Sequence, residues 1–440
     1  MERHRHHDEC CGPEVKAGSG MKPLKALISL EEGFTILMES VKPIDRTEVV
    51  PLLQANSRVL AQDVKAEMDV PPFPRAAMDG YAVLAEDTFP AGTFNPVQLK
   101  LLEVIHAGEE AKETVHKGTC IQVATGSPIP PGADAVVMVE DTESEGDRPL
   151  RGHPGGIEPP PGCHIGTVKV YKPVYPRQNV SPQGEDIMKG TAILSEGMLL
   201  TPGRIGVLAA LGIEQVEVYQ KPRIAVIPSG NEIVPLDEPL SPGKIYDVNS
   251  YTLSALIQEN GGIPTIFPIM PDELEKVKDT IEEALAYDLV VLSGGSSVGE
   301  RDMMVQAIEH LGEVKFHGIA VKPGKPTLCG LVEGKLIIGM PGYPTSCLTN
   351  GYGFMVPVLR KLARLPLRRP SPIRVPLSRR VVSTIGRHQY LPVRLEGGEA
   401  VPAFKESGAI TSMALADGWV EIPANVDLVE KGELVDVYLF

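Results

Sequence analysis

The sequence contains no long hydrophobic run, few cysteines and no excess of positive charge. No segment reaches the roughly 18 consecutive apolar residues that a membrane-spanning helix requires, and the first ten residues lack the apolar core of a signal peptide. The six cysteines follow no regular spacing that would indicate a disulfide framework. Lysine and arginine number 42 against 57 aspartates and glutamates, a net charge of −15, which argues against a dedicated nucleic-acid-binding protein. We therefore expect a cytoplasmic protein with reduced cysteines and with neither nucleic acid nor membrane as a partner.

The first 24 residues are expected to be a disordered tail. They are polar and lead into a Gly-Ser-Gly segment. Adjacent cysteines cannot easily bind one ion, and such tracts have low specificity, so a functional metal site is the less favoured interpretation. The potential metal ligands in this tail are His4, His6, His7, Cys10 and Cys11.

The length of 440 residues predicts several domains rather than one core. Ser29 followed by Glu32 resembles a capping box at the start of a helix that ends before Pro43. Short β segments follow, and a Pro/Gly-rich surface loop is expected over residues 146–166. We predict a linker domain from residues 25–64 and 167–200 and a β-rich inserted domain from residues 65–166. The expected β segments are 59–64, 80–83, 97–105, 119–123 and 135–139.

Residues 201–367 alternate between buried strands and amphipathic helices, which predicts a doubly wound α/β domain. Strands are expected at 223–227, 265–269, 289–292 and 336–340, and Asn249 is expected to cap the helix after the first. Right-handed crossovers would make these strands parallel, with helices on both faces. Residues 368–440 return to short β segments, which predicts a small C-terminal β-barrel in which 408–413 is an ordinary turn.

Polar loops follow each predicted parallel strand. Ligands of such sheets bind outside the carboxyl ends of the strands, where these loops would meet. Glycine amides and serine hydroxyls can hold a phosphate, carboxylates can hold a divalent cation, and Lys322 and Lys325 supply counter-charges. The combination favours Mg²⁺-assisted phosphate chemistry. The loops are 229–232, the turn at Pro271 and Asp272, 293–302, which includes Glu300 and Asp302, and 341–346.

Two turns in the β-rich region carry further polar groups. Asp79 precedes a glycine, which suits an exposed carboxylate held by a tight turn. Thr125 and Ser127 flank Gly126 and offer hydroxyl groups. Either turn by itself would be interpreted as an ordinary structural turn.

Eight motifs occur in the order found in the molybdopterin molybdenumtransferases, the MoeA and gephyrin E-domain family, which the chain resembles from about residue 25 to its end. Ala76, Asn231 and Tyr343 depart from that pattern, where serine, aspartate and asparagine are common, and Pro74 and Arg75 also differ. The motifs are AAMDGYA (76–82), ATGSPIP (124–130), QGEDI (183–187), PSGNE (228–232), IYDVNS (245–250), SGGSSVGERD (293–302), VKPGKP (321–326) and PGYPTS (341–346).

The resemblance implies that adenylylated molybdopterin and molybdate bind, that the phosphoanhydride is hydrolysed with Mg²⁺ as cofactor, and that molybdenum is placed on the dithiolene with release of AMP. It also implies a homodimer whose site is shared between subunits, and contact with the pterin adenylyltransferase is a further expectation. Asp302 would bind the metal. The implied catalytic residues are Asp79, Thr125, Glu232, Asp272 and Lys322, and the implied substrate-binding residues are Ser229, Gly230, Ser293, Gly294, Gly295, Ser296, Lys325, Pro341, Gly342, Tyr343, Pro344 and Ser346.

Other functions remain open at this point. The adenylyltransferase that makes the substrate uses a related α/β domain, although the β-rich insertion and the C-terminal barrel argue against it. The protein could also be a non-catalytic dimeric scaffold. The retained carboxylates and lysines argue against this alternative. A tungsten-preferring paralogue is the third alternative.

Overall fold

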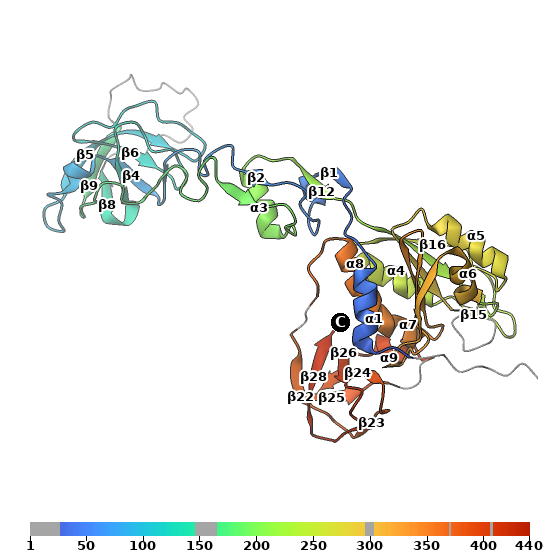
Figure 1. Cartoon of the computed structure of the whole chain (residues 1–440). Helices are drawn as coiled ribbons and strands as arrows, with labels where there is room; N and C mark the ends of the chain where they lie inside the picture. Colours follow the sequence, from blue (N-terminus) through green and yellow to red (C-terminus); the bar gives the residue numbers. More distant parts are fainter. Residues whose placement is uncertain (1–26, 146–164, 295–302, 369–370, 405–407) are drawn as a thin grey trace, which may run out of the picture. The chain divides into compact units, whose positions relative to one another are not determined.

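The computed structural model describes residues 27–145, 165–294, 303–368, 371–404 and 408–440 (Figure 1). The chain divides into two compact units, which are described separately. The α/β unit comprises residues 1–49, 57–59 and 217–440, and the β-rich unit comprises residues 50–56 and 60–216. The expected disordered tail with its histidines and cysteines, and residues 146–164 of the expected surface loop, lie outside the described residues. In the described part of the chain, no helix is long and apolar enough to cross a membrane.

A six-stranded sheet forms the centre of the β-rich unit, in the order β7-β4-β6-β5-β9-β8. Both faces are buried: Tyr81 and Val83 belong to one apolar cluster and Ala82 to the other. A register shift between Leu101 and Glu103 accompanies the change of face along β5. The predicted boundary at 166/167 falls inside β9. The strands are β4 (Gly80–Val83), β5 (Val97–Ile105), β6 (Thr119–Val123), β7 (Ala135–Met138), β8 (Thr142–Glu145) and β9 (Gly166–Val170).

The strand predicted over 59–64 is wrong for most of its length, because only Val64 belongs to a strand. The Leu60 N–H donates to Met198 O, whereas Val59 O accepts from the Tyr219 N–H, so the segment does not pair with a single neighbouring strand. The smaller elements of this unit are η1 (Leu52–Gln54), β2 (Val64–Lys65) paired with β11 (Ala192–Leu194), β3 (Arg75–Ala76) paired with β10 (Val180–Ser181), α2 (Ala85–Thr88), η2 (Val139–Asp141) and α3 (Pro202–Ala210).

The α/β unit contains a six-stranded sheet in the order β16-β13-β17-β21-β20-β18. Its first four strands are parallel, as predicted, whereas β20 and β18 add an antiparallel edge that the sequence did not indicate. The strands are β13 (Arg223–Pro228), β16 (Ile263–Ile266), β17 (Leu289–Ser293), β18 (Glu313–His317), β20 (Leu328–Val332) and β21 (Lys335–Met340).

Helices cover both faces of this sheet, which confirms the doubly wound prediction (Figure 1). Alternate residues of β13 pack to opposite sides: Val226 joins the cluster of α1, α4 and α8, and Ile227 joins the cluster of α5 and α6. The Ser29 side chain caps α1 by accepting the Glu32 N–H at 3.1 Å. The helices are α1 (Leu30–Glu39), α4 (Asn249–Glu259), α5 (Leu274–Ala284), α6 (Met303–Leu311), α7 (Pro344–Asn350), η3 (Gly351–Met355) and α8 (Val356–Leu362).

The C-terminal part of the α/β unit is a second six-stranded sheet, in the order β19-β24-β26-β28-β22 with β25 on β24. The end of β22 returns to β25: Leu377 forms a bridge with Ala400, and the Ser378 N–H donates to Ala400 O at 2.9 Å, so β22 and β25 join the two edges of the sheet in part, as expected for a small barrel. The turn expected over 408–413 contains the short helix α9 (Thr411–Ala414). The strands are β19 (Val321–Lys322), β22 (Ile373–Pro376), β24 (His388–Glu396), β25 (Glu399–Pro402), β26 (Gly418–Ile422) and β28 (Leu434–Leu439); the remaining short strands are β1 (Thr47–Pro51), β12 (Gln215–Tyr219), β14 (Ile233–Val234), β15 (Ile245–Tyr246), β23 (Val381–Val382) and β27 (Leu428–Val429).

Candidate functional site

The loops after β13 and β17 meet at the carboxyl ends of the parallel strands. The Ser229 N–H donates to Ser293 O at 2.8 Å, and the Ser229 hydroxyl donates to Asp272 Oδ1 at 3.1 Å. Both serines are buried. Ser229, Asp272 and Ser293 were expected at one edge of the sheet because each follows a parallel strand, and the structure brings them into contact there.

Gly294 makes the closest approach between these loops. Its φ of +96° lies in the region that favours glycine, and a methyl group on it would lie 2.0 Å from Ser229 O. A methyl group on Gly342, after β21, would lie at an ordinary 3.6 Å from Gly294 Cα. The loops after three neighbouring strands therefore meet at this point.

Gly230 and Glu232 complete the acidic side of this edge. Gly230 has a φ of +142°, and its added methyl group would lie 2.6 Å and 2.8 Å from the two Glu232 carboxylate oxygens. The exposed Glu232 carboxylate thus folds back over Gly230, while half-buried Asp272 is bonded to the neighbouring Ser229. Two carboxylates from two different loops, Glu232 after β13 and Asp272 after β16, therefore lie next to the Ser229–Gly230 segment.

Asn249 does not cap α4, contrary to the expectation from sequence, because it is the first residue of the helix. The carboxylate of Asp247 accepts the Ser250 N–H at 3.1 Å, which is a capping interaction. The Asn249 side chain instead donates from Nδ2 to Gly342 O at 2.9 Å. Asn249 therefore fastens the loop after β21 to α4, a role that its spacing in the sequence could not reveal.

The segment 341–346 turns directly from β21 into α7. Pro341 and Ser346 are buried, Pro344 opens the helix, and Tyr343 is 65% exposed. A methyl group on Gly408 would lie 3.6 Å from the Tyr343 ring. The ring of Tyr343, which stands where asparagine is common in the resembled family, thus lies beside the segment that precedes α9.

Lys322 and Lys325 lie on a loop that the structure ties to other elements. Val321 and Lys322 form β19 of the C-terminal sheet, and Lys322 Nζ lies 3.3 Å from Thr384 Oγ1. The loop is held to α7 because Asn350 Nδ2 donates to Gly324 O at 2.8 Å. The first half of the loop is therefore a sheet strand, which a two-residue stretch before proline does not indicate.

Three implied site residues, Gly295, Ser296 and Asp302, lie outside the described residues. Glu300 lies there as well. Among the residues that are described, no group of three or more histidines, cysteines, aspartates or glutamates is arranged to hold a metal ion.

Asp79 and Thr125 form a second polar arrangement, within the β-rich unit. Asp79 Oδ1 accepts the Thr125 backbone N–H at 2.6 Å and its hydroxyl at 2.8 Å. These donors, the backbone one most strongly, hold the pKa of the Asp79 carboxyl below its usual value. The geometry depends on Gly126, whose φ of +86° favours glycine, and on buried Ala76, which accepts the Gly126 N–H at 2.8 Å. The two turns that looked ordinary separately are thus parts of one structure.

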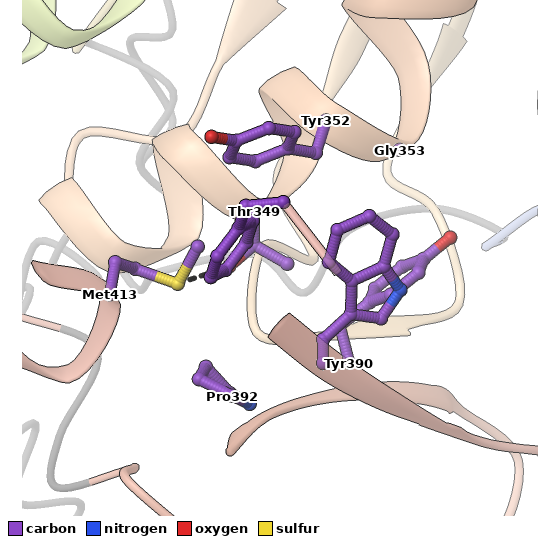
Figure 2. A pocket seen from close by; sticks show the side chains of 8 residues that line it. Thr349, Tyr352, Gly353, Tyr390, Pro392 and Met413 are labelled. Atoms are coloured by element: carbon purple, nitrogen blue, oxygen red, sulfur yellow. Dashed lines mark hydrogen bonds between the residues drawn. The ribbon is translucent and has the colours of Figure 1, made fainter. Parts of the chain in front are cut away.

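An apolar crevice lies between α7, η3 and the C-terminal sheet (Figure 2). Its volume of about 10 Å³ is close to the minimum for one water molecule. Thr349 donates to the Met413 sulfur at 3.6 Å across it, and the Tyr352 and Trp419 ring centroids are 5.7 Å apart. We interpret the crevice as a packing junction rather than a ligand site.

Three family models match the chain in sequence order. They are described as the MoeA N-terminal region, domains I and II (residues 28–212), a probable molybdopterin binding domain (225–361) and the MoeA C-terminal region, domain IV (374–440).

Similar proteins match along most of their length. A molybdopterin molybdenumtransferase of Staphylococcus epidermidis is 30% identical over 420 residues, covering 94% of this chain and 95% of that protein. A Nostoc protein of the same name is 34% identical over 353 residues, covering 78% and 77%. The crystal structure of a molybdopterin biosynthesis MoeA protein from Pyrococcus horikoshii has 42% identity and a TM-score of 0.77, covering 94% of this chain and 99% of that one.

Proposed function

Because the chain belongs to the MoeA family of molybdopterin molybdenumtransferases, we propose that it inserts molybdenum from molybdate into adenylylated molybdopterin, with Mg²⁺-dependent hydrolysis and release of AMP. It is a transferase of molybdenum cofactor biosynthesis. The N-terminal and C-terminal family regions flank the α/β domain, which argues against a lone adenylyltransferase domain.

The observation that carries the proposal is the meeting of the strand-end loops around Ser229, Ser293 and Gly342. Such an edge can bind a phosphate through backbone amides and hydroxyls, without a dedicated cationic pocket. Asp272 orients the Ser229 hydroxyl through the 3.1 Å hydrogen bond. The hydroxyl proton is therefore directed at Asp272, and the Ser229 oxygen is held in place as an acceptor or metal donor, while backbone amides remain for the phosphate.

Hydrolysis of the phosphoanhydride joins a water oxygen to phosphorus, breaks the bond from that phosphorus to the bridging oxygen, and releases AMP. In this proposal the exposed Glu232 carboxylate accepts the proton that the water loses, because it lies over Gly230 beside the phosphate-binding edge. Lys322 and Lys325 balance the charge of the phosphate or the oxyanion.

Magnesium fits the chemistry of this edge. The carboxylates of Asp272 and Glu232 and the hydroxyl of Ser229 are hard oxygen donors of the kind that Mg²⁺ prefers. Asp302 would be its main protein ligand, and the bound ion would supply positive charge to the phosphoanhydride.

The proposal includes a homodimer in which Asp79 and Thr125 of one subunit serve the site of the other. Its support is chemical: the exposed Asp79 carboxylate is held ionised by Thr125 and belongs to neither apolar cluster of its own sheet. A reducing cytoplasm is also part of the proposal. It is supported by Cys120, Cys329 and Cys347, which are buried free thiols.

The test is AMP release from adenylylated molybdopterin by the purified protein with Mg²⁺ and molybdate. Release should depend on the oxyanion, and Asp302→Asn should remove most of it while leaving the unfolding transition unchanged. A non-catalytic scaffold would release no AMP with molybdate or tungstate. A tungsten-preferring enzyme would release it faster with tungstate.

A further inference from the structure

A cavity of about 230 Å³ lies beside Asp79 at one end of the sheet in the β-rich unit. It forms where β4 begins and where β5, β6 and β7 end. Its polar lining includes Asp79, His106 and Gln122, and its apolar lining includes Val104, Val123 and Val139. The lining therefore combines polar groups and an apolar wall in similar proportions.

Part of the polar lining of the cavity is not used by the fold. Both hydrogen bonds to the Asp79 carboxylate end on Oδ1, and within the described residues Oδ2 accepts none. No hydrogen bond from the described part of the chain reaches the side chains of His106 or Gln122. A carboxylate oxygen, an imidazole and an amide are therefore available to a ligand.

The charge and size of the cavity restrict what it can bind. Thr125 keeps the Asp79 carboxyl ionised, so the lining repels phosphate and oxyanions and attracts N–H donors. A volume of about 230 Å³ is below the roughly 300–1,000 Å³ of pockets that enclose a drug-sized ligand. The cavity therefore suits a neutral heterocycle rather than a whole nucleotide-linked substrate.

We propose that this cavity binds the pterin ring system of the substrate, an inference that rests on the proposed function. The pyrimidinone part of a pterin carries neighbouring ring and exocyclic N–H groups, which donate to a carboxylate such as Asp79. The Gln122 amide can both donate to and accept from the ring's heteroatoms, and the valines cover an apolar ring face. His106 and Gln122 thereby acquire a binding role that no motif of the sequence indicated.

The experiment uses 6-hydroxymethylpterin, a neutral fluorescent pterin, as the probe for the full-length protein. Its affinity is measured by fluorescence titration, and the affinity for AMP is measured separately by calorimetry. We expect Gln122→Leu to weaken pterin binding about tenfold and His106→Ala to weaken it several-fold, because each removes hydrogen bonds to the ring. AMP affinity should stay within about twofold.

His116→Ala is the matched control, because His116 is another exposed histidine of the same unit that does not line the cavity. It should leave pterin affinity unchanged. Unchanged pterin affinity in both cavity variants would overturn the inference, as would equal weakening of pterin and AMP. If the wild-type protein releases AMP from its substrate but shows no saturable pterin binding, the inference is overturned and the proposed function still stands. Pterin binding without any oxyanion-dependent AMP release would instead overturn the proposed function.

Discussion

Gly294→Ala should damage both the stability of the α/β unit and its activity. The new methyl group would lie 2.0 Å from Ser229 O, whereas real contacts of this kind begin near 3 Å. The two loops would have to separate by about 1 Å, and the hydrogen bond from the Ser229 N–H to Ser293 O resists that movement. The positive φ of Gly294 adds backbone strain for any other residue.

The expected loss of stability is about 1–3 kcal/mol, the range for a residue forced into a sparsely populated backbone region. A loss of activity is expected in addition to the loss of stability. A displacement of about 1 Å at a site that positions reacting groups can reduce the rate about a hundredfold. Activity should therefore fall even at temperatures where the variant remains folded.

Gly342→Ala is the matched comparison. It introduces the same methyl group at the same edge, but the nearest atom, Gly294 Cα, would lie at 3.6 Å. Its stability should stay within about 0.5 kcal/mol of the wild type. Unfolding can be followed by the fluorescence of Trp419, the single tryptophan of the chain, which packs against Tyr352 in the same unit. Activity is followed by oxyanion-dependent AMP release.

Two results would refute this reasoning. The first is a Gly294→Ala protein as stable and active as the wild type. The second is equal destabilisation by both substitutions, which would show that the approach to Ser229 is not what restricts Gly294.

Three other perturbations test separate parts of the proposal. Asp79→Ala subunits mixed with Asp302→Asn subunits should regain activity in heterodimers, which carry one intact shared site; mixtures as inactive as the separate variants would contradict a shared site. Tyr343→Asn should change the molybdate-to-tungstate ratio of AMP release several-fold, within the roughly 1–3 kcal/mol that small pocket changes supply, while nucleotide binding stays the same. An unchanged ratio would show that the Tyr343 ring only fills space and has no part in the choice of oxyanion. Thr125→Val removes one of the donors that lower the pKa of Asp79, so the carboxylate is protonated at a higher pH than in the wild type. The acid limb of the pH–activity profile should therefore move to higher pH. An acid limb at the wild-type pH would show that activity does not depend on the ionisation of Asp79.

The alternation of strands and helices over residues 201–367 was sufficient to predict that β13, β16, β17 and β21 are parallel and that helices cover both faces. Those features follow from local hydrophobic periodicity and from the handedness of crossovers. The same reasoning placed Ser229, Asp272 and Ser293 at one edge, because loops after parallel strands share an edge. The cap at Ser29 was likewise readable from neighbouring residues.

Tertiary structure decided the contacts that join distant segments. Asp79 meets Thr125, and Asn249 holds Gly342, through hydrogen bonds whose partners lie 46 and 93 residues apart. Lys322 belongs to the C-terminal sheet because Val321 and Lys322 pair with β24. A two-residue strand is too short to show hydrophobic periodicity in the sequence. Such pairings depend on how already formed elements pack, since each costs loop-closure entropy that only the assembled core offsets. The residue types of the candidate site could therefore be identified from the local sequence, whereas its geometry depends on the packing of the whole unit.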